Sequence, residues 1–224
     1  MDRRKTTKRS LSRLILMRLG WFSSVSAAAL FAALPTFADV IAATSTTNVV
    51  TSGNTTDVTT SNIQGSTAYN KFSQFNVNAG STVNVYQPLN TDALVNIING
   101  GQSTIAGTLN AMKIVDPNVL NSATAIGSNV FFVNSDGFVV SSSGTINAGQ
   151  LTMSAPTSDF VANLTNEADG NLTVGLDSPT AQLFAGSEPL SDTGQITIDG
   201  QINAARLALR SGGAGMLLRG RITV

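Results

Sequence analysis

A short segment of this chain occurs twice, and this repeat restricts the possible folds more than any other feature. Residues 146–153 (INAGQLTM) and 202–209 (INAARLAL) place apolar side chains at the same positions, and both carry Asn-Ala after the first Ile. Leu109-Asn110-Ala111 begins in the same way. Each unit is interpreted as a strand, a turn at Asn-Ala and a second strand. Such repeats stack as coils of a β-solenoid, in which equivalent residues form ladders and Asn can stack its amides.

Short strand-like runs fill the chain from Ala68 onward, separated by turns rich in Gly, Asn, Asp and Ser. The runs are Phe75–Val77, Thr82–Tyr86, Leu94–Ile98, Ser103–Leu109, Asn129–Val133, Phe138–Val140, Gly144–Ile146, Leu151–Met153, Leu172–Val174, Ile196–Ile198, Arg206–Leu209 and Met216–Arg219. Such short runs favour many short strands over a sandwich of long ones. We therefore predict an all-β fold, a parallel β-helix over residues 68–224.

The two ends of the segment 39–224 suggest different structures. Residues 39–67 are polar and rich in Thr, Ser and Asn, which is compatible with an N-terminal cap or with a flexible extension. Residues 195–224 resemble two unfinished coils, and Ile222-Thr223-Val224 is itself strand-like. Solenoids normally end in an atypical capping unit. We therefore expect the β-helix domain to continue beyond residue 224, with this chain as the front portion or a remnant of a longer protein.

The first 38 residues have the three-part pattern of a secretory signal peptide. Seven Lys/Arg and one Asp give this segment a net charge of +6, and an apolar stretch runs from Trp21 to Leu34. Thr36-Phe37-Ala38 then places small residues at both ends of a cleavage motif, which predicts cleavage between Ala38 and Asp39. The apolar stretch is shorter than the roughly 20 residues that span a bilayer. We predict a cleaved leader and no integral membrane segment.

Charge and composition exclude several classes of function. Residues 39–224 carry six Lys/Arg and twelve Asp/Glu, a net charge of −6 that is poorly suited to binding nucleic acid. The chain has no Cys and no His. It therefore cannot form disulfides or a Ser-His-Asp triad. The absence of Cys also suits a chain that crosses the periplasm unfolded.

The acidic residues give no sign of a catalytic or metal site. Enzymes with β-helix folds need clustered carboxylates with a cation or a water between them. Here the acids stand apart in the sequence, at Asp57, Asp92, Asp116, Asp136, Asp159, Asp177 and Asp199. Only Glu167-Ala168-Asp169 places two together, in what we predict to be a polar loop. We expect no enzymatic activity, no cofactor and no metal.

Four segments in order resemble the two-partner secretion domain that opens filamentous haemagglutinins and related large adhesins, haemolysins and inhibition toxins. The stretch Tyr69–Val85 (YNKFSQFNVNAGSTVNV) is similar to the family's opening pattern of alternating Phe and Val. Ile105–Ala111 (IAGTLNA), Asn129–Val140 (NVFFVNSDGFVV) and Asn147–Leu151 (NAGQL) follow in the family's order. The family's asparagine-proline-asparagine-glycine turn corresponds here to Asn-Ser-Asp-Gly.

The resemblance implies a route of export and a fold. Members of the family cross the inner membrane through the Sec machinery, and POTRA domains of a dedicated outer-membrane transporter then recognise their N-terminal domain. They emerge through its barrel and fold progressively as a right-handed β-helix. For this chain, the resemblance implies a secreted or cell-surface exoprotein of a Gram-negative bacterium, adhesin-like and connected with virulence.

Five residues are the candidate transporter-recognition site: Asn134, Ser135, Asp136, Gly137 and Phe138. The same residues are also explained by a tight turn between two strands, with Gly137 supplying a positive φ. Phe72 and Phe75 could likewise contact a partner, although core packing is the simpler explanation. Two other functions stay open: a β-helical extracellular carbohydrate-active enzyme, and an autotransporter passenger fragment.

Overall fold

A computed structural model describes residues 37–114, 125–171, 175 and 177–224. These residues are mostly β-structure, with two short helices. The elements are β1 (Asp39–Ala42), β2 (Thr47–Ser52), β3 (Thr55–Thr60), β4 (Ile63–Gln64), β5 (Thr67–Asn76), β6 (Thr82–Gln87), β7 (Ala93–Ile98), β8 (Ser103–Ile105), β9 (Thr108–Lys113), β10 (Ala125–Ile126), β11 (Asn129–Asn134), β12 (Gly137–Val140), β13 (Thr145–Ser154), α1 (Ser158–Ala168), α2 (Pro179–Ala185), β14 (Gln195–Ile198), β15 (Gln201–Arg210), β16 (Met216–Leu218) and β17 (Arg221–Thr223). The predicted leader, apart from Phe37 and Ala38, and the predicted strand Leu172–Val174 lie outside the described residues.

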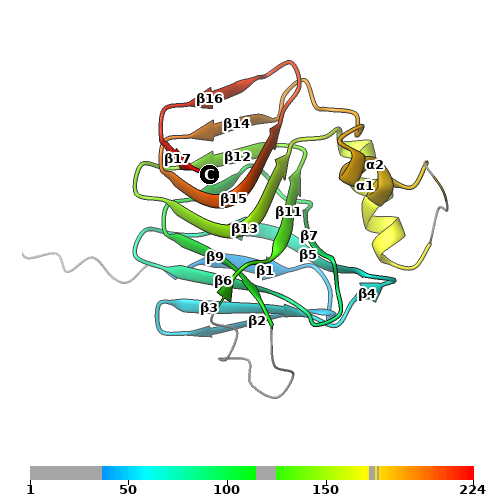
Figure 1. The fold of residues 1–224 in the computed structure, drawn as a ribbon, viewed down its shortest axis with the longest axis horizontal. Coiled ribbons are helices and arrows are strands. Elements are labelled where there is room, and N and C mark those ends of the chain that lie inside the picture. Colours follow the sequence, from blue (N-terminus) through cyan, green and yellow to red (C-terminus); the bar gives the residue numbers. More distant parts are fainter. Residues whose placement is uncertain (1–36, 115–124, 172–174, 176) are drawn as a thin grey trace, which may run out of the picture. The chain divides into compact units, whose positions relative to one another are not determined.

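Most strands pair in parallel, in three stacks that follow the order of the chain (Figure 1). One stack is β5-β7-β11-β13, and a second is β3-β6-β9-β13-β15-β17. The third, a separate sheet, is β8-β12-β14-β16. Strand β13 belongs to two stacks, because residues 145–147 pair with β9 and residues 150–154 pair with β11. Within each stack, the order of the strands in space is therefore their order along the chain.

The repeat seen in the sequence is a stacked repeat in the structure. Ile146 pairs with Ile202, and the register continues to Met153, which pairs with Leu209. Leu109 occupies the equivalent position on β9 and pairs with Ile146. The predicted turn at Asn-Ala is wrong, however, because Asn147 and Ala148 lie inside the continuous strand β13. Asn147 is there because its side chain points away from the core between two inward residues, not because it adopts a left-handed conformation.

Asparagines form a hydrogen-bonded ladder along the outer side of the second stack. The Nδ2 of Asn110 donates to Oδ1 of Asn84 at 2.9 Å, and Asn147 donates to Asn110 at 2.9 Å. Asn203 continues the row by donating to Asn147 at 2.8 Å, and Asn84 donates at its other end to Asp57 at 2.9 Å. The spacing along the sequence grows from 27 and 26 residues to 37 and 56. The stacked strands therefore keep their register although the chain between them varies greatly in length.

Two predicted strand boundaries need correction. The run Ser103–Leu109 is two strands, β8 and β9, which are separated at Gly107. A Cβ at Gly107 would lie 2.3 Å from the carbonyl oxygens of Asn78 and Ser81, so only glycine fits where the chain turns there. Conversely, the two runs predicted between residues 144 and 153 are parts of the single strand β13.

Residues 39–67 form strands β1 to β4. Strands β2 and β3 make an antiparallel hairpin, and β3 pairs in parallel with β6. Strand β1 runs antiparallel to β5, and β4 also pairs with β5. This segment therefore introduces antiparallel pairing at the start of stacks that are otherwise parallel.

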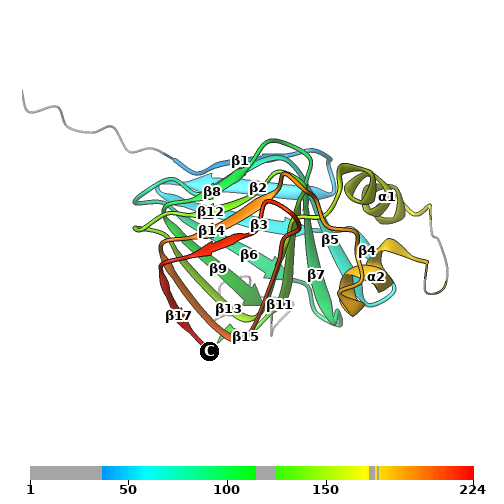
Figure 2. The same ribbon diagram turned by 90° about the horizontal axis from the view of Figure 1, so that it is seen from above.

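The hydrophobic core lies between the sheets and consists mainly of Val, Ile, Leu and Phe side chains. Phe72 and Phe75 are buried there, with ring centroids 5.0 Å apart, and Phe75 lies 5.3 Å from Phe132. Their assignment to core packing is thus confirmed. A second cluster lies on the opposite side of β5, β7 and β11, where α1 and α2 cover the strands (Figure 2). All six residues of β7 are consequently buried.

The helices α1 and α2 were not expected from an all-β prediction, but the sequence carries signals for both. Thr157 caps α1 by accepting a hydrogen bond from the Phe160 amide at 3.3 Å, and the buried Phe160, Leu164 and Ala168 recur at helical spacing. In α2, Ser178 is the N-cap, Pro179 is the first residue and Gly186 ends the helix with φ 72°. Residues 39–224 are rich in Asn, Thr and Gly, which are poor helix formers, so the composition as a whole did not suggest helices. Within the described parts of the chain, neither helix has the length and apolar character needed to cross a membrane.

Candidate recognition site

The predicted recognition residues form the tight turn between β11 and β12. The Oδ1 atom of Asn134 accepts a hydrogen bond from the Asp136 amide at 3.0 Å, which closes the turn. Its Nδ2 atom donates to the Gly101 carbonyl and to Ser103 Oγ, both at 3.0 Å. Asn134 is fully buried, so its side chain closes the turn and joins it to the start of β8.

Two further residues of the predicted site are also structural. Gly137 has φ 82°, and a Cβ there would lie 2.0 Å from the carbonyl oxygen of Gln195 on the neighbouring strand β14. Phe138 is fully buried in the core. The interpretation of this segment as a tight turn with a positive φ at Gly137 is confirmed.

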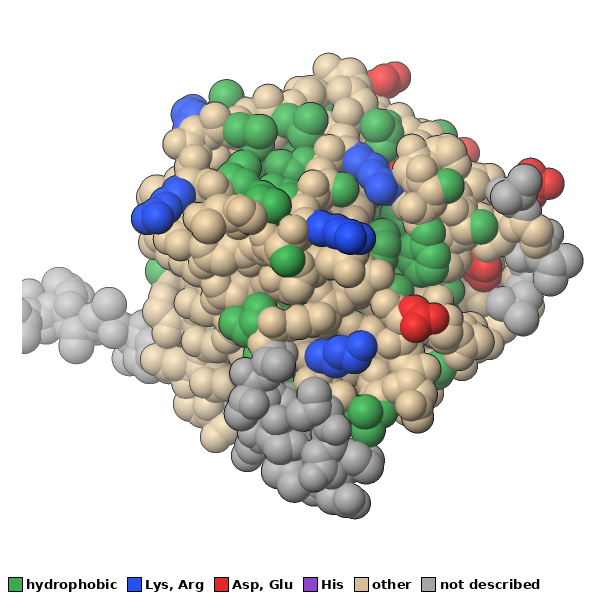
Figure 3. Space-filling view, viewed as in Figure 1, with side chains coloured by type: hydrophobic (Ala, Val, Ile, Leu, Met, Phe, Trp, Pro, Cys, Tyr) green, Lys and Arg blue, Asp and Glu red, His purple; other side chains and the backbone are tan. Residues whose placement is uncertain are grey.

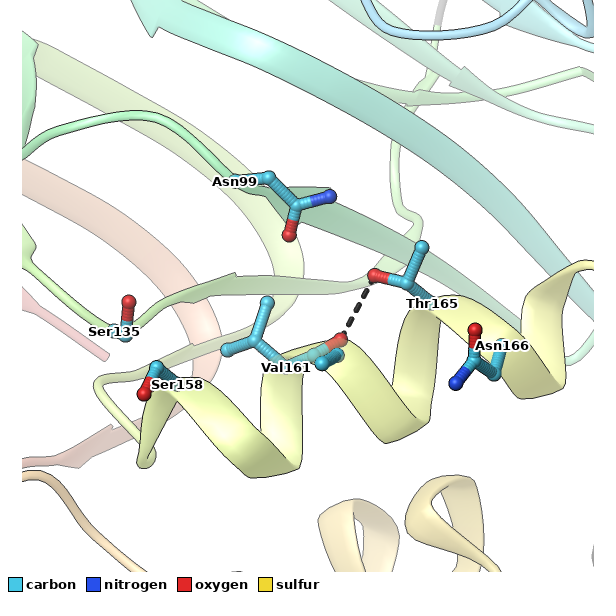
Figure 4. Close-up of a pocket in the computed structure, with 7 residues that line it drawn as sticks. Asn99, Ser135, Ser158, Val161, Thr165 and Asn166 are labelled. Atoms are coloured by element: carbon cyan, nitrogen blue, oxygen red, sulfur yellow. Dashed lines mark hydrogen bonds between the residues drawn. The ribbon is translucent and has the colours of Figure 1, made fainter.

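Only Ser135 and Asp136 are available at the surface of the turn, Ser135 half-buried and Asp136 exposed. Ser135 lines a cavity of about 360 Å³ between the turn and α1 (Figure 4). Asn99 and five residues of α1 also line it, three polar (Ser158, Thr165 and Asn166) and two apolar (Val161 and Ala162). Thr165 Oγ1 donates to the Val161 carbonyl at 2.8 Å. The cavity wall thus presents hydroxyl and amide groups, which can exchange hydrogen bonds with a partner's backbone or polar side chains.

The paired acids at residues 167–169 do not form a polar loop as predicted. Glu167 is buried at the end of α1, where its Oε1 accepts from Ser178 Oγ at 2.6 Å and its Oε2 from the Thr180 amide at 2.9 Å. Asp169 forms an ion pair with the buried Lys71. Both carboxylates therefore hold α1 against α2 and β5.

The neighbouring Tyr69 has the same structural role. Its hydroxyl lies 2.8 Å from Thr180 Oγ1, and burial raises the pKa of the phenol above its usual value. Among the described residues, no three His, Cys, Asp or Glu side chains gather as a metal site would require. Glu167 therefore accepts hydrogen bonds at the N-terminal end of α2, and both of its carboxylate oxygens have partners.

The predicted cleavage position lies at the beginning of the first strand. Asp39 is the first residue of β1 and pairs with Asn76, and its carboxylate accepts a hydrogen bond from Gln74. Ala38 packs against the core, whereas Phe37 is half-exposed. Cleavage after Ala38 would leave every described strand intact.

The predictions from sequence found the turn but missed its neighbour α1. The signal was present in Thr157 and in the spacing of Phe160, Leu164 and Ala168. That helix brings Ser158 and Thr165 beside Ser135, which the sequence order alone could not indicate. No protein-family model matches this sequence, and no curated protein matches it either.

Proposed function

We propose that this chain is the secretion domain of a two-partner-secreted surface exoprotein, folded as a right-handed parallel β-helix with an N-terminal cap. In this proposal the leader directs Sec export, and POTRA domains of an outer-membrane transporter recognise the domain in the periplasm. The domain then reaches the cell surface of a Gram-negative bacterium as part of an adhesin-like protein.

The observation that carries the proposal is that the parallel stacks grow in chain order. Strands β5, β7, β11 and β13 add one after another, and the same holds for β6, β9, β13 and β15. No strand of these stacks has to insert between two earlier ones. A chain that emerges N-terminus first can therefore fold coil by coil, each new coil pairing with the last.

The four segments that resemble the family occupy successive levels of these stacks. Tyr69–Val85 spans β5 and β6, and Ile105–Ala111 spans β8 and β9. Asn129–Val140 contributes β11, the turn and β12, and Asn147–Leu151 lies in β13. Their order along the sequence is thus also their order along the stacks, as expected for a repeated coil.

Dependence on a transporter tests the proposal directly. We expect export to require an outer-membrane barrel protein with POTRA domains, most simply one encoded beside this gene. Deleting that transporter should leave the protein in the periplasm, and restoring it should return the protein to the surface. N-terminal sequencing of the exported protein should begin at Asp39. Unchanged surface display without the transporter would contradict the proposal and favour a different export route.

The recognition role of the turn needs a variant that does not disturb the fold. Replacing Asn134 and Gly137 together should block export. Both residues are also needed by the fold, however, because Asn134 is buried and no Cβ fits at position 137. Gly137→Val alone should therefore damage the fold. Asp136→Lys changes an exposed side chain and should lower export while leaving folded periplasmic protein. Asp177→Lys makes the same charge change at another exposed position and is the control. Equal export of both variants would leave the turn a structural element only.

A further inference from the structure

A groove on the outer side of β11, β13 and β15, beside α2, is separate from the turn and its cavity. It has a volume of about 550 Å³, within the roughly 300–1,000 Å³ of small-ligand sites. Figure 3 shows this face, on which hydrophobic side chains gather near Lys and Arg side chains. The groove thus combines apolar surface with charged side chains of both signs, Arg206, Arg210 and Asp92.

Two arginines of β15 line the groove, and they differ in their hydrogen-bond partners. Arg210 is held in place because its Nη1 atom donates to the Leu183 carbonyl at 2.7 Å and to the carboxylate of Glu188 at 3.1 Å. The Glu188 side chain is fully buried, so this pair is part of the structure. Arg206 is exposed and has no hydrogen-bond or ion-pair partner among the described residues.

The positions of the two guanidinium groups suit an extended anion. Residues four apart in a strand lie on the same side, about 13 Å apart along it. Both side chains line the same groove, one prearranged by Glu188 and one free. A guanidinium group binds a carboxylate through two parallel hydrogen bonds, which gives both affinity and orientation.

An aromatic surface lies between the helix and the strands of the groove. The rings of Phe131 and Phe184 have centroids 4.9 Å apart, and Phe184 remains 42% exposed. An exposed phenyl ring offers an apolar face against which the C–H face of a sugar ring can pack. The partly open aromatic pair is therefore suited to a ligand with one apolar side.

The polar groups of the groove include hydrogen-bond acceptors as well as donors. Gln150 is exposed and pairs in register with Arg206 on the neighbouring strand. Asp92, also exposed, lines the same groove. Hydroxyl groups can satisfy both kinds of partner, because they donate to a carboxylate and accept from an amide or a guanidinium. The side chains of a polyglutamate peptide carry carboxylates but no hydroxyls, so only its backbone N–H groups could donate to Asp92.

We propose that this groove binds a carboxylated oligosaccharide, with its acid group on Arg206 and a sugar ring against Phe184. Arg210 and Gln150 donate hydrogen bonds to the same chain, and Asp92 accepts from its hydroxyls. The proposal is independent of the export route, because it depends only on the outer surface of β11, β13, β15 and α2.

Calorimetric titration of the purified protein with tetragalacturonate tests the proposal, and maltotetraose is the neutral probe. We expect saturable binding of tetragalacturonate that weakens with added salt, and binding of maltotetraose at least tenfold weaker. Arg206→Gln should weaken tetragalacturonate binding by about tenfold or more, because one charge-assisted pair is lost. Arg221→Gln, which removes an exposed arginine outside the groove, is the matched control and should bind normally.

Further binding measurements distinguish the contribution of the sugar ring from that of the carboxylate. Phe184→Ala should weaken tetragalacturonate binding, whereas a hexaglutamate peptide should not compete for the groove. Absence of binding at millimolar tetragalacturonate would overturn the proposal, and so would equal losses in Arg206→Gln and Arg221→Gln. Arg206-dependent binding of hexaglutamate without binding of tetragalacturonate would assign the groove to acidic peptides instead. Circular dichroism of each variant verifies that the fold is retained.

Discussion

Two outer faces of this molecule are built on the same parallel strand pairing but meet their surroundings differently. On the β6-β9-β13-β15 face, the outward side chains include Asn84, Asn110, Asn147 and Asn203, which remain partly exposed. On the β5-β7-β11 face, the outward side chains are mostly apolar, with Lys71 as a charged exception, and are covered by α1 and α2. The first face needs no cover, and the second is part of a second core.

The difference follows from the kind of interaction that each side chain can make. Stacked amides donate and accept hydrogen bonds along the row, so each added strand extends the ladder without any further element. Apolar side chains such as Val95 and Phe131 gain only by being removed from water, which requires another surface. The longest interval between ladder positions, 56 residues, contains both helices that supply this surface.

The largest effect is expected where the helical cover meets the strands. Leu164 of α1 is fully buried and belongs to the second hydrophobic cluster. Leu164→Ala should lower the free energy of unfolding by about 3 kcal/mol, because it removes buried methyl groups and leaves a cavity. Urea unfolding followed by circular dichroism measures this. Asn163→Ala, at an exposed position of the same helix, is the control and should change stability little.

A smaller loss is expected from the ion pair that fastens the end of α1 to β5. The Lys71 side chain is only 3% exposed, and Asp169 is its acidic partner. Asp169→Asn should lower the free energy of unfolding by about 1.5 kcal/mol, because a buried ammonium loses its charged partner. The combination with Lys71→Met should cost less than the sum of the two single changes. Strict additivity in this cycle would show that the pair contributes nothing.

On the ladder face, a single amide should matter less. Asn147→Ala removes one hydrogen bond to Asn110 and one from Asn203, both partly exposed to water. We expect a loss of about 1 kcal/mol in urea unfolding. The matched change Asn48→Ala removes a long, exposed contact to Thr59 and should have almost no effect. Equal losses for the two variants would mean that stacking adds nothing to the ladder.

The last effect is absent at neutral pH and appears only in alkali, and each face contributes one tyrosine. Burial and the nearby Asp57 carboxylate raise the pKa of Tyr86 to about 12, and burial raises the pKa of Tyr69. An unfolded tyrosine ionises near pH 10. The stability from the protonated phenols is therefore complete below pH 10 and is lost as the pH rises toward 12. Urea unfolding between pH 8 and 11 should show this decline.

The variant Tyr86→Phe distinguishes the contributions of the two tyrosines to the loss of stability in alkali. It should make the decline above pH 10 shallower, because one of the two raised pKa values is removed. Absorbance at 295 nm should show that the remaining tyrosine of the folded protein still ionises above pH 10. Ordinary titration of both phenols in the folded wild-type protein would contradict the expected burial.

Much of the fold was predictable because its signals are local. Alternation of apolar residues identified most strands, and the repeat at residues 146 and 202 predicted a pairing that the structure shows residue for residue. The Asp-Gly sequence at residues 136–137 predicted the turn. The strand boundaries around Gly107 and Asn147 were less predictable. Inward residues keep even spacing across Gly107, where the strand ends, whereas the alternation shifts by one at Gly149-Gln150 inside the continuous strand β13.

The sequence by itself determined the inward pattern of the strands, the stacking register of the repeat and the positive φ at Gly137, because period-two alternation and turn chemistry act over a few residues. Only the tertiary structure decided which outer face would be covered. A run such as Ala93–Ile98 is apolar at nearly every position, so its sequence cannot say what packs on its second side. That choice depends on a segment more than 50 residues away. Its buried Glu167 joins α1 to α2, and its Asp169 joins the end of α1 to Lys71 of β5, only after the chain has folded.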